Sequence, residues 1–215
     1  MSKIETIIFD WSGVISDDRQ PVYEANMRIL EANNIPRMEF THFLEEAVGN
    51  APRFLAQQGI EGTTEQLSTL YRTYFNQVVS SGITQKIYPD VKEVLEKLNN
   101  RRIRMAVLSS HPEENLIAES FEFQIQQHFE LIVGSIIDKS QGLLNLIQRM
   151  KTYNAVYCGD TTHDVEAAKS QGILSAAISG NGEIPRGYHS KSKLLSVNPD
   201  FLLNSLTELL QLTTV

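Results

Sequence analysis

Short apolar runs alternate with helical patterns along most of the chain. The runs are rich in Val, Ile, Leu and Ala, and each has the length of a buried strand. They lie at residues 4–9, 103–108, 131–133, 155–158 and 173–178. The segments between them carry apolar residues at the spacing of an amphipathic helix. This alternation predicts an α/β fold, a doubly wound and mostly parallel sheet whose strands are joined by crossover helices.

The interval between the first two runs has a different pattern. Residues 17–85 contain no strand-like run, and their apolar residues, such as Tyr23 and Met27, recur at helical spacing. The sequence therefore predicts an all-helical domain at 17–85. This domain is inserted in an α/β core formed by residues 1–16 and 86–215.

Two further elements are expected in the core. Asp90 is a suitable N-cap for a helix at 91–100, because a short acidic side chain accepts hydrogen bonds from the first turn. Near the C-terminus, residues 199–203 predict a short strand. Leu206 and Leu209 then indicate an amphipathic helix.

Composition narrows the class of protein. The 215 residues are 41% hydrophobic, which is enough for a globular core with an insertion. The net charge of −7 provides no broad basic face, so we expect neither a nucleic-acid nor a membrane partner. The single cysteine, Cys158, excludes an internal disulfide and fits a reducing compartment. No run approaches the roughly twenty apolar residues of a membrane span, and the N-terminus does not resemble a signal peptide. We expect a cytoplasmic monomer or homodimer.

Polar residues follow the apolar runs. In a doubly wound sheet, ligands bind beyond the carboxyl ends of the strands. The side chains expected at that edge, or on a crossover beside it, are those of Asp10, Ser109, Ser110, Lys139, Asp160 and Asp164.

In their order and approximate spacing, these residues resemble the four motifs of the haloacid dehalogenase superfamily of hydrolases. The family's first motif is Asp-x-Asp-Gly-Thr/Val, which is matched from Asp10 to Val14 except at Ser12. The second motif is a Ser or Thr after a hydrophobic strand, and the third is a Lys. The fourth is Gly-Asp-x-x-x-Asp. The residues matching the last three motifs are Ser109, Lys139, Gly159, Asp160 and Asp164.

The resemblance, which covers nearly the whole chain, implies a phosphatase of a small phosphorylated metabolite that forms an aspartyl-phosphate intermediate. Phosphoryl transfer requires groups that position the substrate and neutralise the charge on its oxygens. By resemblance, Asp10 is the nucleophile, and Ser109 and Lys139 grip the phosphoryl group. Gly13 and Ser110 complete the substrate-binding loops.

The resemblance also implies Mg²⁺ as cofactor, because a divalent ion removes the repulsion between a carboxylate and a phosphate. Its expected ligands are Asp10, Asp160, Asp164 and the backbone carbonyl of Ser12. The helical domain resembles the family's mobile cap of the helical-bundle type. Within it, Arg53 is the candidate for a substrate contact, since a guanidinium pairs bidentately with a carboxylate or phosphate.

Ser12 stands where the family has a second Asp, which protonates the leaving oxygen and then activates water. A serine hydroxyl is too weak a base for this, and general acid–base catalysis is worth about 10²–10⁴ in rate. The sequence therefore predicts a slow phosphatase, unless another group supplies the proton. The nearby candidates for that group are Asp17, Asp18 and His163.

The substitution leaves other functions open. A dehalogenase is disfavoured, because that branch is metal-independent and places a Tyr at position 12. Phosphonoacetaldehyde hydrolase chemistry is improbable, since it needs a cap lysine and there is no lysine between Ser12 and Gln85. The remaining alternatives are a dehalogenase or a phosphotransferase of the same superfamily, and a catalytically weak protein that binds a phosphorylated ligand.

Several of these residues also have a purely structural interpretation. Asp160 with Thr161 fits a helix cap. His111 fits a loop histidine. Cys158 fits a buried strand residue. Trp11 is expected either to wall the pocket or to pack under the helical domain.

Overall fold

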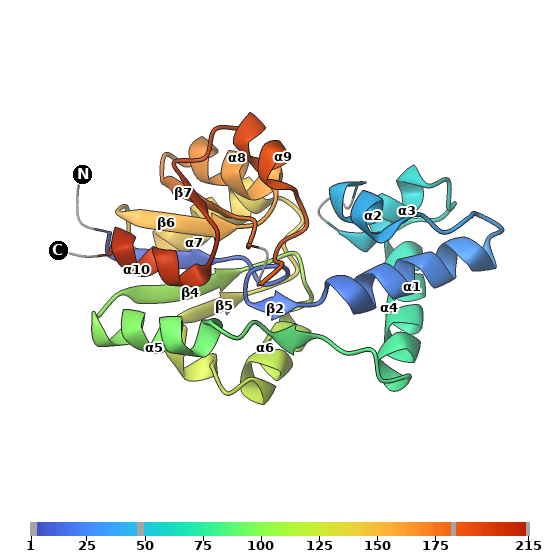
Figure 1. The fold of residues 1–215 in the computed structure, drawn as a ribbon, viewed down its shortest axis with the longest axis horizontal. Helices are drawn as coiled ribbons and strands as arrows, with labels where there is room; N and C mark the ends of the chain where they lie inside the picture. Colours follow the sequence, from blue (N-terminus) through green and yellow to red (C-terminus); the bar gives the residue numbers. More distant parts are fainter. Residues whose placement is uncertain (1–3, 47–49, 182–183, 214–215) are drawn as a thin grey trace. The chain divides into compact units, whose positions relative to one another are not determined.

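The computed structural model describes residues 4–46, 50–181 and 184–213. The chain forms two compact units, which we call the α/β unit and the helical unit (Figure 1). The α/β unit consists of Met1–Ser16 and Ile87–Val215, and the helical unit is Asp17–Lys86.

A six-stranded parallel sheet forms the centre of the α/β unit, in the order β5-β4-β1-β6-β7-β8. The predicted α/β class with a parallel sheet is confirmed. The strands are β1 (Thr6–Phe9), β4 (Arg104–Leu108), β5 (Leu131–Val133), β6 (Ala155–Gly159), β7 (Leu174–Ile178) and β8 (Phe201–Leu203). Phe9 at the end of β1 pairs with Val107 of β4 and with Cys158 of β6. The carboxyl ends of these three central strands therefore lie side by side.

Helices cover both faces of the sheet (Figure 1). Because side chains alternate along a strand, Ile7 and Phe9 enter one core and Ile8 enters the other. The first core is closed by α5 (Val91–Asn100), α6 (Glu113–Glu122) and α10 (Leu209–Leu212), and the second by α7 (Lys139–Met150) and α8 (Thr162–Ser170). A further helix, α9 (Lys191–Ser196), follows β7. Cys158 is buried as predicted, and burial raises the pKa of its thiol.

The N-cap expected at Asp90 differs from the prediction. Helix α5 does begin at Val91, but the Asp90 side chain accepts no capping bond. Its backbone already has helical angles, φ −87° and ψ −10°, rather than the extended conformation that aims a capping side chain at the first turn. The Asp90 carboxylate instead pairs with Arg186 and accepts the Leu206 N–H at 2.9 Å.

The C-terminal region also departs in part from expectation. A short strand, β8, is present, but the predicted amphipathic helix is a 3₁₀ turn, Leu206–Glu208, followed by the single turn of α10. Leu206 and Leu209 are nevertheless fully buried. The apolar spacing therefore identified the buried side chains correctly. It did not predict that the regular α-helix would be only one turn long.

The helical unit contains α1 (Arg19–Ala32), α2 (Phe40–Glu46), α3 (Ala51–Gln57) and α4 (Thr64–Ser80). Its core includes edge-to-face contacts among Tyr23, Phe43 and Phe54. Asn50 caps α3, and Thr63 with Gln66 forms a capping box on α4. A separate two-stranded sheet pairs β2 (Ser16–Asp17) with β3 (Lys86–Ile87). These two-residue strands are too short to produce a sequence pattern, and the sequence did not predict them.

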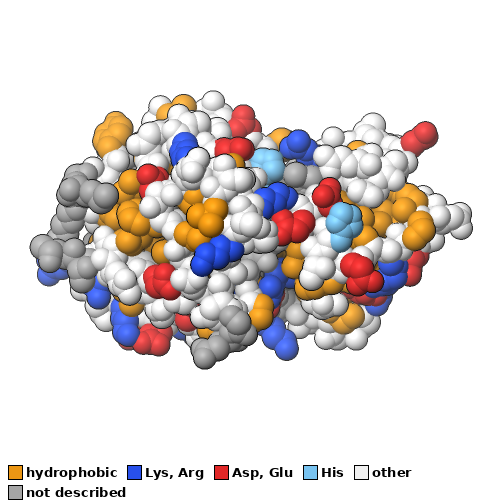
Figure 2. Space-filling view, turned by 45° about the horizontal axis from the view of Figure 1, so that its top comes forward, with side chains coloured by type: hydrophobic (Ala, Val, Ile, Leu, Met, Phe, Trp, Pro, Cys, Tyr) orange, Lys and Arg blue, Asp and Glu red, His pale blue; other side chains and the backbone are white. Residues whose placement is uncertain are grey.

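Acidic, basic and apolar side chains are interspersed on the face of the molecule drawn in Figure 2. Within the described ranges, no helix combines the length and the hydropathy that crossing a bilayer would need.

Candidate active site

Asp10 directly follows β1 at the carboxyl edge of the sheet and is almost fully buried. Its position is fixed by a backbone bond from Asp10 N–H to the Cys158 carbonyl, 2.8 Å. One carboxylate oxygen, Oδ2, accepts a hydrogen bond from Lys139 Nζ at 2.8 Å. The other, Oδ1, is buried and has no partner among the described residues.

Lys139 is the first residue of α7, whose N-cap is Asp138. Its ammonium lies between two carboxylates and also donates to Asp164 Oδ1, at 2.5 Å. Burial alone would lower the pKa of Lys139, but the carboxylates of Asp10 and Asp164 raise it above its usual value. Lys139 is therefore a fixed positive charge at the site.

Asp164 lies in the first turn of α8 and is saturated with donors. Its Oδ2 accepts from the Thr161 N–H (3.0 Å) and the Thr161 hydroxyl (2.6 Å), while Oδ1 accepts from Lys139 and from the Tyr157 hydroxyl (3.0 Å). Against the effect of burial, Lys139 and Thr161 lower the pKa of Asp164, so it is ionised. Its lone pairs are occupied by protein donors.

Asp160 follows β6 and is also buried. Its Oδ2 accepts the Tyr188 N–H at 2.7 Å, whereas Oδ1 is buried with no partner in the described structure. Gly13 packs directly against this carboxylate. A Cβ at position 13 would lie 2.2 Å from Asp160 Oδ2, and the backbone φ there is +72°. Only glycine fits both the conformation and the space.

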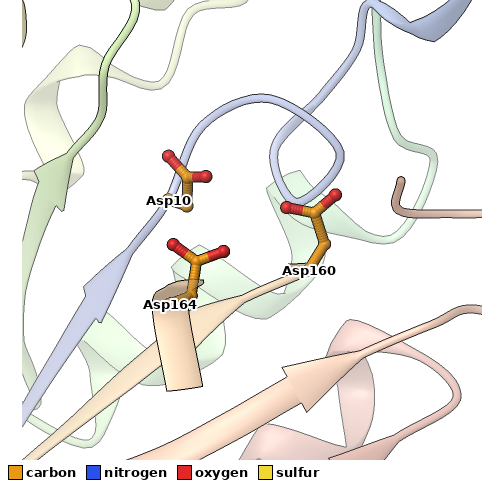
Figure 3. A group of neighbouring side chains, drawn as sticks. All are labelled: Asp10, Asp160 and Asp164. Atoms are coloured by element: carbon orange, nitrogen blue, oxygen red, sulfur yellow. The ribbon is translucent and has the colours of Figure 1, made fainter. Parts of the chain in front are cut away.

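The three carboxylates converge from β1, β6 and α8 (Figure 3). One ligand oxygen from each of Asp10, Asp160 and Asp164 lies within 4.8 Å of the others. Three carboxylates share one ammonium, so the cluster carries excess negative charge when ionised. Burial and the neighbouring carboxylates raise the pKa of Asp160, and burial raises that of Asp10.

These features fit a divalent cation. Mg²⁺ prefers a few hard oxygen ligands, and the two carboxylate oxygens of the cluster that have no described partner belong to Asp10 and Asp160. A cation beside them would supply the missing positive charge. Asp164 is close enough to contribute, but its oxygens are already engaged by Lys139, Tyr157 and Thr161.

The predicted serines lie on the loops that follow β1 and β4. Ser109 is buried directly after β4, its N–H donates to the Val133 carbonyl, and its Oγ accepts the His111 N–H at 3.3 Å. Ser110 and Ser12 are half-buried. Ser12 is in the tight loop in which the Gly13 N–H donates to the Ser16 carbonyl, 2.8 Å.

The candidates for a substitute base have different surroundings. Asp17 is held by Arg19 through two hydrogen bonds, 2.7 and 3.0 Å. Asp18 is buried in the helical unit. His163 is half-buried at the start of α8, and its Nδ1 has no partner within the described ranges. His163 directly precedes Asp164 in the sequence, and its Nδ1 is available to bind a proton. It is therefore the best of the three candidates.

Arg53 is an exposed residue of α3 in the helical unit, and its N–H donates to the Asn50 side chain. The structure brings together Asp10, Lys139, Asp160, Asp164 and Gly13 in the α/β unit. It does not place Arg53 relative to them, so a substrate contact by Arg53 stays a prediction.

Several supporting residues were not predicted. Tyr157, on the apolar run of β6, carries the hydroxyl that bonds Asp164, and burial raises the pKa of that hydroxyl so that it stays a donor. A polar tyrosine within an otherwise apolar run was the available signal. The loop containing Tyr188 gave no signal, because its contact with Asp160 is made by a backbone N–H.

Trp11 also differs from expectation. Its ring is fully buried inside the α/β unit, where it stacks on Phe123 and meets Phe129 edge-on, and its Nε1 donates to Glu119 at 2.7 Å. Residue 11 lies beyond the end of β1, and its side chain enters the core that α6 closes.

Comparison with known proteins gives the family of the chain and agrees with its fold. Residues 7–178 match the family model described as haloacid dehalogenase-like hydrolase. A phosphoglycolate phosphatase from Vibrio parahaemolyticus is 25% identical, covering 99% of this chain and 97% of that protein. Another, from Synechococcus elongatus, is 29% identical over 60% of each chain. Among solved structures, a haloacid dehalogenase-like hydrolase from Streptococcus pneumoniae has a TM-score of 0.85 at 19% identity, with both chains covered completely.

Proposed function

The chain belongs to the haloacid dehalogenase-like hydrolases, and we propose that within this family it is a Mg²⁺-dependent phosphatase of a small phosphorylated metabolite. The observation that carries the proposal is the buried cluster in which Lys139 joins Asp10 to Asp164 while one oxygen each of Asp10 and Asp160 has no described partner. Burying so much charge is costly unless a ligand completes it.

Asp10 is the proposed nucleophile. Its carboxylate oxygen attacks phosphorus, the bond from phosphorus to the leaving oxygen breaks, and that oxygen takes up a proton. Water then attacks the phosphorus of the aspartyl phosphate, which regenerates the Asp10 carboxylate and releases inorganic phosphate. Lys139 holds Asp10 through Oδ2 and leaves Oδ1 for the reaction or for the metal.

The proposed metal ligands are Asp10, Asp160 and the backbone carbonyl of Ser12. When bound, Mg²⁺ neutralises charge between the carboxylates and the phosphoryl oxygens. Asp164 was predicted as a ligand, but its four donors favour an indirect role in which it fixes Lys139 and the start of α8. Ser109 offers a hydroxyl proton to a phosphoryl oxygen, since its Oγ accepts the bond from His111. Ser110 and the backbone around Gly13 bind the remaining oxygens.

Ser12 makes this phosphatase slow. The serine orients the leaving group or the attacking water but does not accept its proton near neutrality. The variant Ser12→Asp tests this directly, because it restores the acid and base that the family has at this position. Turnover should rise, by up to the roughly 10²–10⁴-fold that general acid–base catalysis contributes. An unchanged rate would mean that proton transfer is supplied by another group such as His163.

The helical unit is the proposed cap, and Arg53 its proposed substrate contact. Relatives named phosphoglycolate phosphatases support a small phosphorylated acid, whose carboxylate a guanidinium pairs with bidentately. Arg53→Ala should raise KM for such a substrate and leave kcat for a generic aryl phosphate unchanged. The exposed arginine of the same unit, Arg72, provides the control as Arg72→Ala. Equal KM values in wild type and Arg53→Ala would remove Arg53 from the site.

The proposal is tested by phosphate release from p-nitrophenyl phosphate and from a metabolite panel that includes 2-phosphoglycolate, with and without Mg²⁺. We expect Mg²⁺-dependent release that Asp10→Asn abolishes. Binding of a phosphorylated ligand without turnover would instead identify a phospholigand-binding protein. Phosphoryl transfer to a second metabolite in place of water would identify a phosphotransferase.

A further inference from the structure

A further buried carboxylate of the α/β unit, that of Glu119, lies outside the acidic cluster. Glu119 is on α6 and is 6% exposed. Both of its oxygens are engaged: Oε2 accepts the Trp11 Nε1–H at 2.7 Å, and Oε1 lies 3.2 Å from His111 Nε2. It occupies the buried face of the helix with Leu116 and Ser120.

An apolar side chain would fill this position at lower cost. A buried carboxylate loses its hydration, and replacement of buried polar groups by well-packed apolar ones is often neutral or stabilising. Glu119 is therefore poorly explained by stability alone. Its two partners suggest what it does instead.

Each partner belongs to a loop that carries a site residue. Trp11 directly follows Asp10 on the loop after β1. His111 follows β4, and its N–H donates to Ser109 Oγ at 3.3 Å. Because β1 and β4 are adjacent parallel strands, these loops leave the sheet side by side. The Glu119 carboxylate bridges them through side chains, in addition to the backbone pairing of the strands.

We propose that Glu119 is a positioning residue, which holds Trp11 and His111 so that the Asp10 carboxylate and the Ser109 hydroxyl keep the spacing that one phosphoryl group requires. The inference rests on the proposed function. Glu119 itself does not touch the substrate. It acts through the backbone of the two loops.

Three variants test this role. Glu119→Ala removes the bridge. Glu119→Gln keeps an acceptor for Trp11 and a group that bonds His111. The matched control is Thr152→Val, which breaks the buried Thr6–Thr152 hydroxyl bond of 2.7 Å at the opposite end of β1. A further variant, Trp11→Phe, keeps an aromatic ring in the core but removes the N–H donor together with part of the ring system.

The kinetic readout is the division of the effect between kcat and KM. Glu119→Ala should lower kcat about 10- to 100-fold, as expected for loops displaced by up to an ångström, with little change in KM. Trp11→Phe should lower kcat in the same direction, and Glu119→Gln should retain most of the rate. Thr152→Val should lower the melting temperature and leave kcat unchanged. A kcat for Glu119→Ala equal to that of Thr152→Val would overturn the proposal.

A spectroscopic readout is independent of turnover. Trp11 is the only tryptophan, so the ¹H–¹⁵N spectrum has one indole resonance. This resonance should move upfield in Glu119→Ala and stay close to its native position in Glu119→Gln. It should also move when Mg²⁺ and inorganic phosphate are added to wild type. If the wild-type chain proves inactive, the proposed function fails, while this response still decides whether the bridge is coupled to the site. The positioning role would be overturned if the chemical shift of the Trp11 indole changed neither in Glu119→Ala nor on addition of phosphate.

Discussion

The α/β unit contains a buried cluster of ion pairs around Lys139, whereas Arg37 of the helical unit forms its pairs near the surface. Lys139, Asp10 and Asp164 form pairs whose side chains are at most 12% exposed. In the helical unit, Arg37 bonds Glu24 and Glu31 with its own side chain 36% exposed. Since burial of charge is costly and surface pairs contribute little, loss of a partner should be far more damaging in the Lys139 cluster than at Arg37.

The largest effect on stability should come from Lys139→Met. This change leaves the buried Asp10 and Asp164 carboxylates without their shared cation, and breaking a buried pair costs about 3–5 kcal/mol. Urea denaturation measures the change in the free energy of unfolding. The control is Lys92→Met on the exposed face of α5. If Lys139→Met lowers the free energy of unfolding no more than Lys92→Met does, the stability of the buried cluster does not depend on Lys139.

A metal titration can distinguish the proposed metal ligand Asp160 from the supporting residue Asp164. Asp160→Asn should weaken Mg²⁺ binding more than the roughly 10- to 100-fold that loss of a merely supporting residue costs. The loss of Mg²⁺ affinity in Asp164→Asn should stay within about 10- to 100-fold, because the oxygens of Asp164 already accept hydrogen bonds from protein donors. Isothermal titration with Mg²⁺ in the absence of substrate provides the comparison. Equal losses in the two variants would contradict the division of roles.

Tyr157→Phe should lower the stability of the protein moderately. It removes one donor to the buried Asp164 carboxylate, and a hydrogen bond to a charged group is worth about 1.5–3 kcal/mol. Tyr153→Phe is the matched control, since Tyr153 is 80% exposed. Thermal unfolding of the two variants measures the difference. Indistinguishable melting temperatures would show that the Tyr157 hydroxyl does not support Asp164.

The smallest effect is expected in the helical unit. Arg37→Ala removes two partly exposed pairs, each worth about 0–1 kcal/mol. Phosphate release from an aryl phosphate should be unchanged, and unfolding should shift only slightly. A lower kcat in Arg37→Ala would show that the ion pairs of Arg37 contribute to catalysis, contrary to the proposed difference between the two units.

Much of the α/β unit could be predicted because it depends on local patterns. Continuous apolar runs located the parallel strands, and the rule that ligands bind at strand carboxyl ends selected the residues that form the acidic cluster. The two-residue pair of β2 and β3 was missed because it is shorter than any detectable period.

Contacts that depend on tertiary packing could not be predicted. Asp90 has the sequence features of a helix cap, but its partner Arg186 lies far along the chain and was invisible to local reasoning. Glu119 appears in the sequence as one more acidic residue of an amphipathic helix, and only the fold brings it to Trp11. The metal ligands could be proposed from spacing, whereas the distinction between the open Asp160 and the saturated Asp164 required the hydrogen bonds.

The proposed phosphatase activity requires that Asp10 accept the phosphoryl group. The direct measurement is a quench of wild-type protein during turnover of an aryl phosphate with Mg²⁺, followed by borohydride reduction and peptide mass spectrometry. Borohydride converts an aspartyl phosphate to homoserine. We therefore expect homoserine at position 10, because Ser12 slows hydrolysis of the intermediate and lets it accumulate. Turnover with an intact Asp10 and no modified residue at that position would contradict it.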